Sequence, residues 1–420
     1  MATVTTGDLK ATRVDPHDLT RADLWAEDRW QEPMRALREH GPIHRNETSK
    51  FGPHWSVVQY KPIQHIEALP KIFSSSWEYG GITVEQDGAA NLREHDMDLP
   101  MFIAMDPPKH SEQRRTVAPA FGPAEVERMR ADAIARTSAL FDTLPIGNPF
   151  DWVKSVSMEL TTQMLAILFG FPWDKRDKLN QWSDIGGNIE QGSTTEGRKF
   201  RAETGVEMAG AFMQLWTAKA QDPSGPDLIS VMLRSDAMSH MEPNDFLANL
   251  VLLVVGGNDT TRNSMSAFAW GLQQYPDQRA ILEANHSAEL AVNAMHEIIR
   301  WQTPLSHMRR TATEDTELFG QQIKKHDKIA LWYASGNRDE SVFPDGEHIR
   351  VERDNARRHL SFGYGIHRCV GARVAEMQLI ALISEMQKRR LRVNVIEVPE
   401  IVPGCFVHGY KKMMVELERY

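Results

Sequence analysis

One short run near the C-terminus constrains the fold more than any other part of the sequence. Residues 361–371 read Ser-Phe-Gly-Tyr-Gly-Ile-His-Arg-Cys-Val-Gly, and a periodic stretch predicted to be a helix follows at 371–389. Gly363 and Gly365 permit backbone turns that other residues avoid, so N–H groups can point at the sulfur of Cys369. The helix dipole also favours an anionic sulfur. The run therefore predicts a presented thiolate, against the alternative of a small buried core cysteine.

A second run, residues 250–261, has two interpretations. It reads Leu-Val-Leu-Leu-Val-Val-Gly-Gly-Asn-Asp-Thr-Thr. In a helix, Leu252, Val255, Gly256 and Thr260 would share one face. Alternatively, the apolar residues could form a buried strand and Asp259 the N-cap of a new helix, as at the start of a nucleotide-binding unit. The G-x-G-x-x-G spacing of such a unit is missing, which weakens that alternative.

The cysteine run matches Phe-x-x-Gly-x-His-x-Cys-x-Gly and resembles the haem-ligand loop of the cytochrome P-450 family, in which a cysteine thiolate binds the haem iron. The resemblance implies haem b (iron protoporphyrin IX) as the cofactor and Cys369 as the axial ligand, with Phe362, Gly363 and Gly371 beside the haem. It also implies a mainly α fold with small β-sheets. In that fold, a triangular prism, the haem lies between a long central helix and the helix of the cysteine loop.

Within this resemblance, Gly-Gly-x-Asp-Thr-Thr at 256–261 is similar to the part of the family's central helix that passes over the distal face of the haem. Thr260 is then expected to hold the oxygen ligand and a water, and Asp259 to relay protons from solvent. Leu252, Val255 and Gly256 are expected to border the substrate.

Further motifs fit the same family. Glu297 and Arg300 resemble its buried Glu-x-x-Arg pair, and alignment places His348 where a third member, usually arginine, is expected. Because histidine can lose its charge near neutrality, this support would be sensitive to pH. The resemblance also implies four donors to the haem propionates, namely His110, Arg114, Arg310 and His367.

Composition sets outer limits. The 420 residues carry a net charge of −9 and only two cysteines, which argues against nucleic acid as a partner and against a disulfide framework. No linker, signal peptide or membrane-spanning run is visible, so we expect one domain over 1–420, with a tail at 1–20, in the cytoplasm without a membrane anchor. Helices are expected at 121–142, 152–170, 175–190, 196–220, 243–274, 276–284, 287–301 and 371–389, and strands at 55–60, 328–333 and within 391–417.

The resemblance implies a monooxygenase that uses O2 and hydroxylates unactivated C–H bonds of a small hydrophobic substrate. Residues 51–57, 80–83 and 256–266 resemble the bacterial subfamily that hydroxylates the terminal (omega) carbon of medium-chain alkanes or fatty acids. Alternatives are subterminal hydroxylation of a terpenoid or aromatic substrate, a peroxygenase, and a haem-thiolate sensor. Electrons are expected from a 2Fe-2S ferredoxin and its NAD(P)H-dependent reductase, with docking at Arg357, Arg358, Arg368 and Arg373. Besides the central-helix residues, expected pocket residues are the 77–104 loop, Leu305, Ser306, Met308, Phe406 and Val407.

Overall fold

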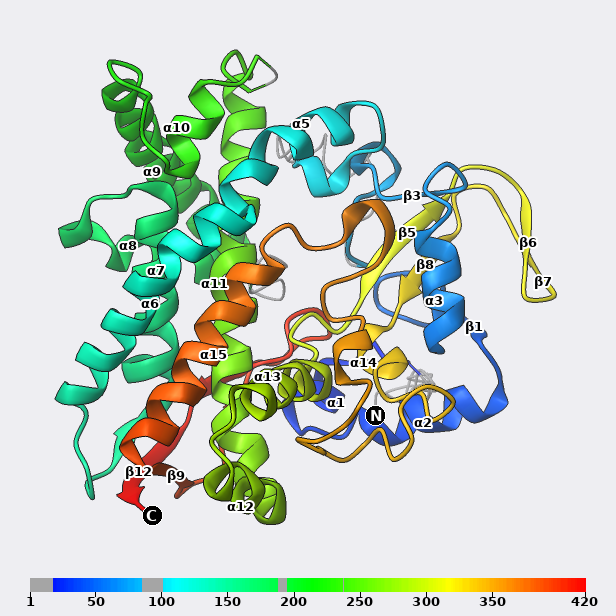
Figure 1. Ribbon diagram of the computed structural model, residues 1–420. Coiled ribbons are helices and arrows are strands. Elements are labelled where there is room, and N and C mark those ends of the chain that lie inside the picture. The colour runs from blue at the N-terminus through cyan, green and yellow to red at the C-terminus, as the bar shows by residue number, and fades with distance from the viewer. Residues whose placement is uncertain (1–17, 85–100, 188–194, 237) are drawn as a thin grey trace, which may run out of the picture.

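The computed structural model describes residues 18–84, 101–187, 195–236 and 238–420. The described part is mainly helical (Figure 1). Its helices are α1 (Ala22–Ala26), α2 (Gln31–His40), α3 (Tyr60–Glu67), α5 (Lys109–Val117), α6 (Pro123–Thr143), α7 (Glu159–Phe169), α8 (Asp177–Gly187), α9 (Thr195–Lys219), α10 (Leu228–Leu233), α11 (Pro243–Gln274), α12 (Pro276–Ala284), α13 (Ala288–Gln302), α14 (Tyr333–Gly336) and α15 (Ala372–Arg389). A π-helical turn, Val153–Met158, leads into α7.

The strands form small sheets. They are β1 (Ile43–Asn46), β2 (His54–Val57), β3 (Phe73–Ser74), β4 (Phe150–Asp151), β5 (Met308–Ala312), β6 (Thr316–Leu318), β7 (Gln321–Ile323), β8 (Lys328–Leu331), β9 (Leu391–Val395), β10 (Glu400–Ile401), β11 (Tyr410–Lys412) and β12 (Met414–Arg419). The largest sheet has the order β1-β2-β8-β5-β3, and β2 pairs with β8 in parallel. Figure 1 shows this sheet beside the helical part of the molecule.

The long helix α11 joins two separate hydrophobic cores. Its first half contributes Phe246, Leu250 and Val254 to a core shared with helices α6 to α10. Its last turns contribute Met265 and Phe268 to a second core with α13, α15 and the C-terminal strands. Between them, residues 255–264 are the glycine-rich and polar part of the helix, so its apolar packing is interrupted at mid-length.

The eight predicted helices are all present, and two of them, 243–274 and 276–284, have the predicted bounds. Residues 250–255 are therefore helical, and the alternative of a buried strand before a nucleotide-binding turn is wrong. The expected strands at 55–60 and 328–333 are shorter than predicted, because the chain turns into α3 at Tyr60 and into α14 at Tyr333.

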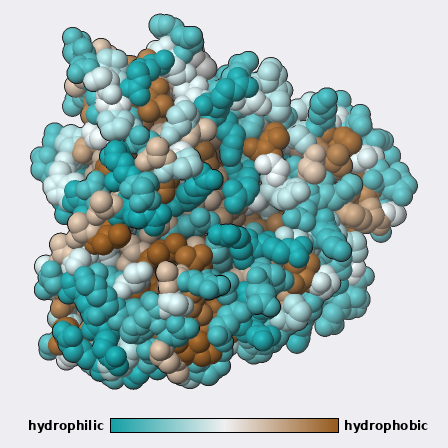
Figure 2. Space-filling model, in the orientation of Figure 1, coloured by the Kyte–Doolittle hydropathy of each residue, from teal (hydrophilic) through white to brown (hydrophobic). Residues whose placement is uncertain are grey.

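The predicted tail at 1–20 lies outside the described residues except for its last three. These are packed: Leu19 is buried in a tryptophan-rich cluster with Trp25, Trp30 and Trp332. Within the described part of the chain, none of the helices has both the length and the apolar character needed to cross a membrane. On the face shown in Figure 2, hydrophobic side chains form separate patches among hydrophilic ones.

A buried ion network holds the long segment between α14 and the cysteine loop. Glu297 and Arg300 on α13 are fully buried and joined by two hydrogen bonds, of 2.7 and 2.8 Å. The third member of the network is Arg353, whose Nε lies 3.0 Å from Glu297 Oε1. Both guanidiniums also donate to backbone carbonyls of the segment, including those of Pro344 and Gly346. Because the three charged side chains are buried, the network fixes the path of the chain toward the cysteine loop.

The prediction that His348 completes this network is wrong. Its imidazole is exposed, bonds to Asp345 and lies edge-on to the ring of Tyr275, whereas its backbone carbonyl accepts from both Arg300 and Arg353. The segment turns at Asp345, which has a positive φ of 56° and lies three residues before His348. The third charged group of the network is therefore Arg353, five residues further along the chain. Because this group is a guanidinium, the sensitivity to pH that was expected from a histidine has no basis.

Replacing Arg353 with Met should lower the free energy of unfolding by about 3 kcal/mol, because the Glu297 carboxylate would keep only one of its two cationic partners. Thermal unfolding of the Arg353→Met variant, compared with the unmodified protein, would measure this loss of stability. The matched control is His348→Ala, which should change stability by less than about 0.5 kcal/mol since the side chain is exposed. Equal losses in both variants would contradict the assignment.

Candidate functional site

The cysteine loop lies against the end of α3. Gly363 and Gly365 have positive φ values of 69° and 66°, as the sequence suggested. A Cβ at Gly365 would collide with the backbone oxygen of Glu67, so this close approach requires glycine. The N–H of Cys369 donates to the carbonyl of Phe362 at 2.7 Å, which closes the loop just before α15 begins. The loop thus presents its sulfur from a rigid turn.

The electrostatics of the sulfur differ from the expectation. The Cys369 side chain is exposed, but protein surrounds its sulfur on most sides, and this burial raises the pKa of the thiol. The N–H of Gly371 and the charges of Arg114 and Arg368 act in the opposite direction and are outweighed. A cation bound at the sulfur would favour the thiolate, because a coordinating thiol loses its proton to the metal.

The middle of α11 has one exposed face. Leu252, Val255, Gly256 and Thr260, which were predicted to share a face, are all at least partly exposed, whereas Leu253 and Val254 are buried. A Cβ built on Gly256 would have no atom within 4 Å, so open space lies beside the helix there. The hydroxyl of Thr260 donates to the carbonyl of Gly256 at 2.9 Å. This stripe is the part of α11 that was expected to face the distal side of the haem.

Asp259 points to the other side of α11. Its side chain is 2% exposed and accepts a hydrogen bond of 2.7 Å from Ser183 on α8. Arg262, one turn further along, forms an ion pair of 3.0 Å with the same carboxylate. Asn180 bonds to both Asn258 and Arg262, so a chain of polar groups runs from Asp259 along α8. The sequence did not identify Ser183 and Asn180, because helix α8 shows no motif that links it to α11.

The predicted propionate donors gather between α5, β5 and the cysteine loop. The rings of His110 and His367 lie 4.3 Å apart, centroid to centroid. Both nitrogens of buried His110 and Nδ1 of His367 have no hydrogen-bond partner. Burial, with the nearby charges of Arg114 and Arg310, lowers the pKa of His110 to about 4 and that of His367 well below its usual value. Two neutral imidazoles with unused nitrogens thus lie beside two guanidiniums.

Arg310 has a partner that the sequence did not reveal. Its guanidinium forms a 2.9 Å ion pair with Glu67, a fully buried carboxylate at the end of α3. Tyr333 donates a hydrogen bond of 2.6 Å to the same carboxylate oxygen. Burial raises the pKa of Glu67 and outweighs the effect of Arg310. One sequence signal was available: Glu67 continues the apolar face of α3 formed by Ile63 and Ile66.

The predicted pocket residues from two distant segments do meet. Leu305 and Val407 form a β-bridge, and the N–H of Ser306 donates to the carbonyl of Phe406 at 2.9 Å. Met308 follows at the start of β5 and is buried. The prediction that Ser306 lines the pocket is wrong, because its side chain is fully buried and its hydroxyl donates to the carbonyl of Cys405. Residues 85–100 of the 77–104 loop lie outside the described residues.

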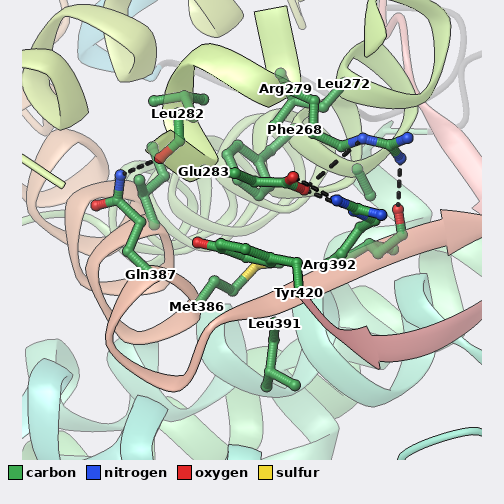
Figure 3. Close-up of a pocket in the computed structure, with 13 residues that line it drawn as sticks. Phe268, Leu272, Arg279, Leu282, Glu283, Met386, Gln387, Leu391, Arg392 and Tyr420 are labelled. Carbon is green, nitrogen blue, oxygen red and sulfur yellow. Dashed lines mark hydrogen bonds and ion pairs between the residues drawn. The ribbon is translucent and has the colours of Figure 1, made fainter. Parts of the chain in front are cut away.

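A different cavity lies between α12, α15 and the C-terminal strands (Figure 3). It has a volume of about 30 Å³, which is space for roughly one or two water molecules. Its polar rim is already paired, since Glu283 bonds Arg392 and Tyr420 lies beneath that guanidinium. This cavity is a packing gap with no role in the site around Cys369.

Comparison with known proteins agrees with this geometry. The chain matches the cytochrome P-450 family over residues 41–398. It is 35% identical to linalool 8-monooxygenase of Pseudomonas putida, over 95% of this chain and 98% of that protein. It is 30% identical to methyl-branched lipid omega-hydroxylase of Mycobacterium tuberculosis, over 95% and 94% of the two chains. The solved structure of CYP153D17 from Sphingomonas sp. PAMC 26605 is 56% identical, with a TM-score of 0.90, and covers 96% of this chain and all of that one.

The chain belongs to the cytochrome P-450 family and is a haem-thiolate monooxygenase of the bacterial class. The residues present fit the haem that the family implies. The Cys369 side chain is exposed and open space lies beside Gly256. The neutral rings of His110 and His367 each carry one N–H, and among their orphaned nitrogens such a donor can be satisfied by a carboxylate.

Replacing His110 with Phe should speed the loss of haem by about tenfold, because one buried donor to an ionised group would be removed. Transfer of haem from the holoprotein to excess apomyoglobin would measure the rate. His65→Phe, at an exposed position of α3, is the control and should keep the normal rate. An unchanged rate in His110→Phe would argue against a propionate at this histidine.

Proposed function

We propose that the protein hydroxylates the terminal carbon of medium-chain n-alkanes or fatty acids. In this proposal 1–420 is one P-450 domain, with haem b bound through Cys369. The haem, when bound, activates O2 and inserts one oxygen atom into a C–H bond. His110, Arg114, Arg310 and His367 would hold its carboxylates, and Phe362, Gly363 and Gly371 would lie beside it.

The exposed stripe on α11 is the observation that carries the proposal. Leu252, Val255 and Gly256 offer an apolar surface without any polar group that would orient a hydrophilic substrate. Leu305, Met308, Phe406 and Val407, brought together by the bridge at residues 305 and 407, would form the opposite wall. A methyl C–H bond is stronger than a methylene C–H bond, so terminal attack needs a narrow passage that admits only the chain end.

The likeness to relatives supports this choice. One curated relative is named an omega-hydroxylase, which denotes reaction at a chain end. The runner-up is hydroxylation of a terpenoid, which the name of linalool 8-monooxygenase favours. A peroxygenase is less well supported, because peroxide-dependent enzymes have no need of a relay such as Asp259 and Thr260.

Analysis of products would test the substrate proposal. Octane, dodecane and dodecanoic acid should each be supplied to the holoenzyme with a ferredoxin, its reductase and NADPH. We expect 1-octanol and 1-dodecanol, or 12-hydroxydodecanoic acid, as the main products. Mainly subterminal alcohols, or turnover of linalool in preference to all three, would contradict it.

Thr260 and Asp259 would share the delivery of protons. Thr260 lies on the exposed stripe, where its hydroxyl donates to the carbonyl of Gly256 and would be free to accept a hydrogen bond from a water on that face. Asp259 is anchored by Ser183 and Arg262 on the α8 side, where rotation of its side chain would carry a proton from one side of α11 to the other.

Replacing Thr260 with Ala should lower the fraction of electrons recovered in product to about a tenth, because protons would arrive without control. The ratio of alcohol formed to NADPH consumed would measure it, with hydrogen peroxide accounting for the difference. Thr260→Ser retains the hydroxyl and should stay coupled. Equal coupling in the Ala and Ser variants would reject the role of the hydroxyl.

The electron donor would be a 2Fe-2S ferredoxin with its NAD(P)H-dependent reductase, in the cytoplasm. Arg357, Arg358, Arg368 and Arg373 are all exposed around the cysteine loop. This cluster would attract an acidic donor despite the net charge of −9, because association depends on the local field.

A further inference from the structure

Two buried asparagines lie at the two ends of the exposed stripe on α11. Asn249 is three residues before Leu252, and Asn263 is three residues after Thr260. Steps of three and four residues connect positions 249, 252, 256, 260 and 263, so these positions follow one line along the helix. The residues of the stripe are at least partly exposed, whereas both asparagines are fully buried. The stripe therefore ends at a buried amide in either direction.

Asn249 holds the segment before α5 through its backbone. Its Oδ1 accepts a hydrogen bond of 2.9 Å from the N–H of Phe102. Its Nδ2 donates to Oε1 of Gln113 on α5 at 3.1 Å, and to the carbonyl of Asp245 one turn back along α11 at 3.0 Å. The amide thus uses its oxygen and both of its N–H groups. Because these groups are buried, the amide ties α11 firmly to α5 and to the backbone at Phe102.

The short 3-10 turn that Asn249 holds, Phe102–Ala104, connects the two sides of the proposed substrate passage. Phe102 is buried in the core formed by the first half of α11. Ile103 packs against the core of the largest sheet, as Leu305 and Phe406 do. The turn therefore joins the α11 side of the passage to the proposed opposite wall, and Asn249 fixes its backbone.

Asn263 holds the C-terminal segment in the same way. Its Oδ1 accepts a hydrogen bond of 3.1 Å from the N–H of Tyr410. Gly409 lies directly against this side chain, and a Cβ at the glycine would overlap the amide. On its other side the segment is held by the N–H of His408, which donates to the carbonyl of Pro304 at 2.9 Å. Residues 406–410, which include two proposed wall residues, are therefore fixed between α11 and the chain after α13.

The two amides lie at different distances from the proposed site of reaction. Positions 249 and 263 are fourteen residues apart, which is about 21 Å along a helix. Thr260, beside which the proposed function places the oxygen ligand, is one turn from Asn263 and about 16 Å from Asn249. The wall that Asn263 fixes is thus near the reacting carbon, and the wall that Asn249 fixes lies along the rest of an extended substrate.

We propose that the two asparagines are positioning residues with separate tasks: Asn263 fixes the wall that decides which carbon reacts, and Asn249 fixes the wall that binds the rest of the chain. This rests on the proposed function, because it places an extended hydrophobic substrate along the stripe. A neutral amide suits both tasks. It anchors a backbone N–H without burying a charge beside an apolar passage, which would cost free energy.

Kinetics with dodecanoic acid would separate the two tasks, in holoenzyme supplied with a ferredoxin, its reductase and NADPH. Asn263→Leu should lower the ratio of the favoured hydroxylation position to its neighbour about fivefold and change KM less than about twofold, since a small shift of the near wall admits a second carbon. Asn249→Leu should raise KM about fivefold and leave the ratio as it is, because the lost hydrogen bond loosens only the far wall. The ratio is compared with that of the unmodified enzyme, whichever position is favoured.

Rescue and control variants separate positioning from general loosening. Asn249→Asp and Asn263→Asp keep an oxygen that accepts from the backbone N–H, so each should recover most of the property that its Leu variant loses. Ser157→Ala is the matched control. It removes a buried hydrogen bond of 2.9 Å to Ser266, which lies on α11 beyond the end of the stripe, and should change neither the ratio nor KM. Serine, whose hydroxyl is too short to reach either N–H, replaces any Leu variant that fails to fold.

Hydrogen–deuterium exchange of the holoenzyme gives a readout that needs no turnover. In the unmodified protein the N–H groups of Phe102 and Tyr410 should exchange as slowly as those in the middle of α11, because both are held by a buried acceptor. Asn249→Leu should speed exchange at Phe102 alone, and Asn263→Leu at Tyr410 alone.

Three results would overturn the proposal. Fast exchange at Phe102 and Tyr410 in the unmodified protein would mean that the asparagines hold neither segment. Equal shifts of the ratio and of KM in both Leu variants would show general loosening in place of separate tasks. Unaltered values in both variants would show that neither wall needs its amide. The ferrous carbon monoxide complex of each variant tests the proposed function separately, because a red-shifted Soret band reports a thiolate-ligated haem in every case.

Discussion

The interrupted packing of α11 is the constraint on which the rest of the molecule depends. A helix of 32 residues that were apolar throughout would be packed on all sides in a chain of this size. Here the two ends of α11 belong to different cores, and the glycines and polar residues between them belong to neither. Open space lies beside Gly256 because glycine has no side chain to fill it. The two ends of α11 pack into the hydrophobic cores and stabilise the fold, so the residues between them are not required for core packing.

The position of the cysteine loop is set by backbone contacts. Gly365 lies directly on the backbone of Glu67, so the cysteine loop is located by α3 as much as by its own sequence. The segment leading into the loop is held by Arg300 and Arg353, which donate to its carbonyls while Glu297 neutralises them. Fixing a segment through its carbonyls makes few demands on its side chains, which explains why His348 can be an exposed residue.

Features that depend on residues close together in the sequence, such as short motifs and the hydrophobic periodicity of helices, could be predicted from the sequence. Long periodic helices such as α11 and α12 were predicted with their bounds, and the shared face of Leu252, Val255 and Thr260 followed from the 3.6-residue repeat. Pairings over long separations carry no such signal. Arg353 with Glu297, Ser183 with Asp259 and Glu67 with Arg310 each join segments whose relative position only the tertiary fold decides.

The balance of charge around the propionate donors follows from these long-range pairs. Arg310 already faces Glu67, so its guanidinium is not wholly available to a second anion. His110 and His367 are neutral and contribute hydrogen bonds without charge. Arg114 donates to the backbone carbonyl of Arg368 and, among the described residues, forms no ion pair with a carboxylate. Three carboxylates, those of Glu67 and of the haem, would meet two guanidiniums, so the cluster would carry excess negative charge or retain a proton. In both cases the charge around the haem would be less positive than if all four donors were cations. A less positive surrounding would lower the reduction potential of the haem.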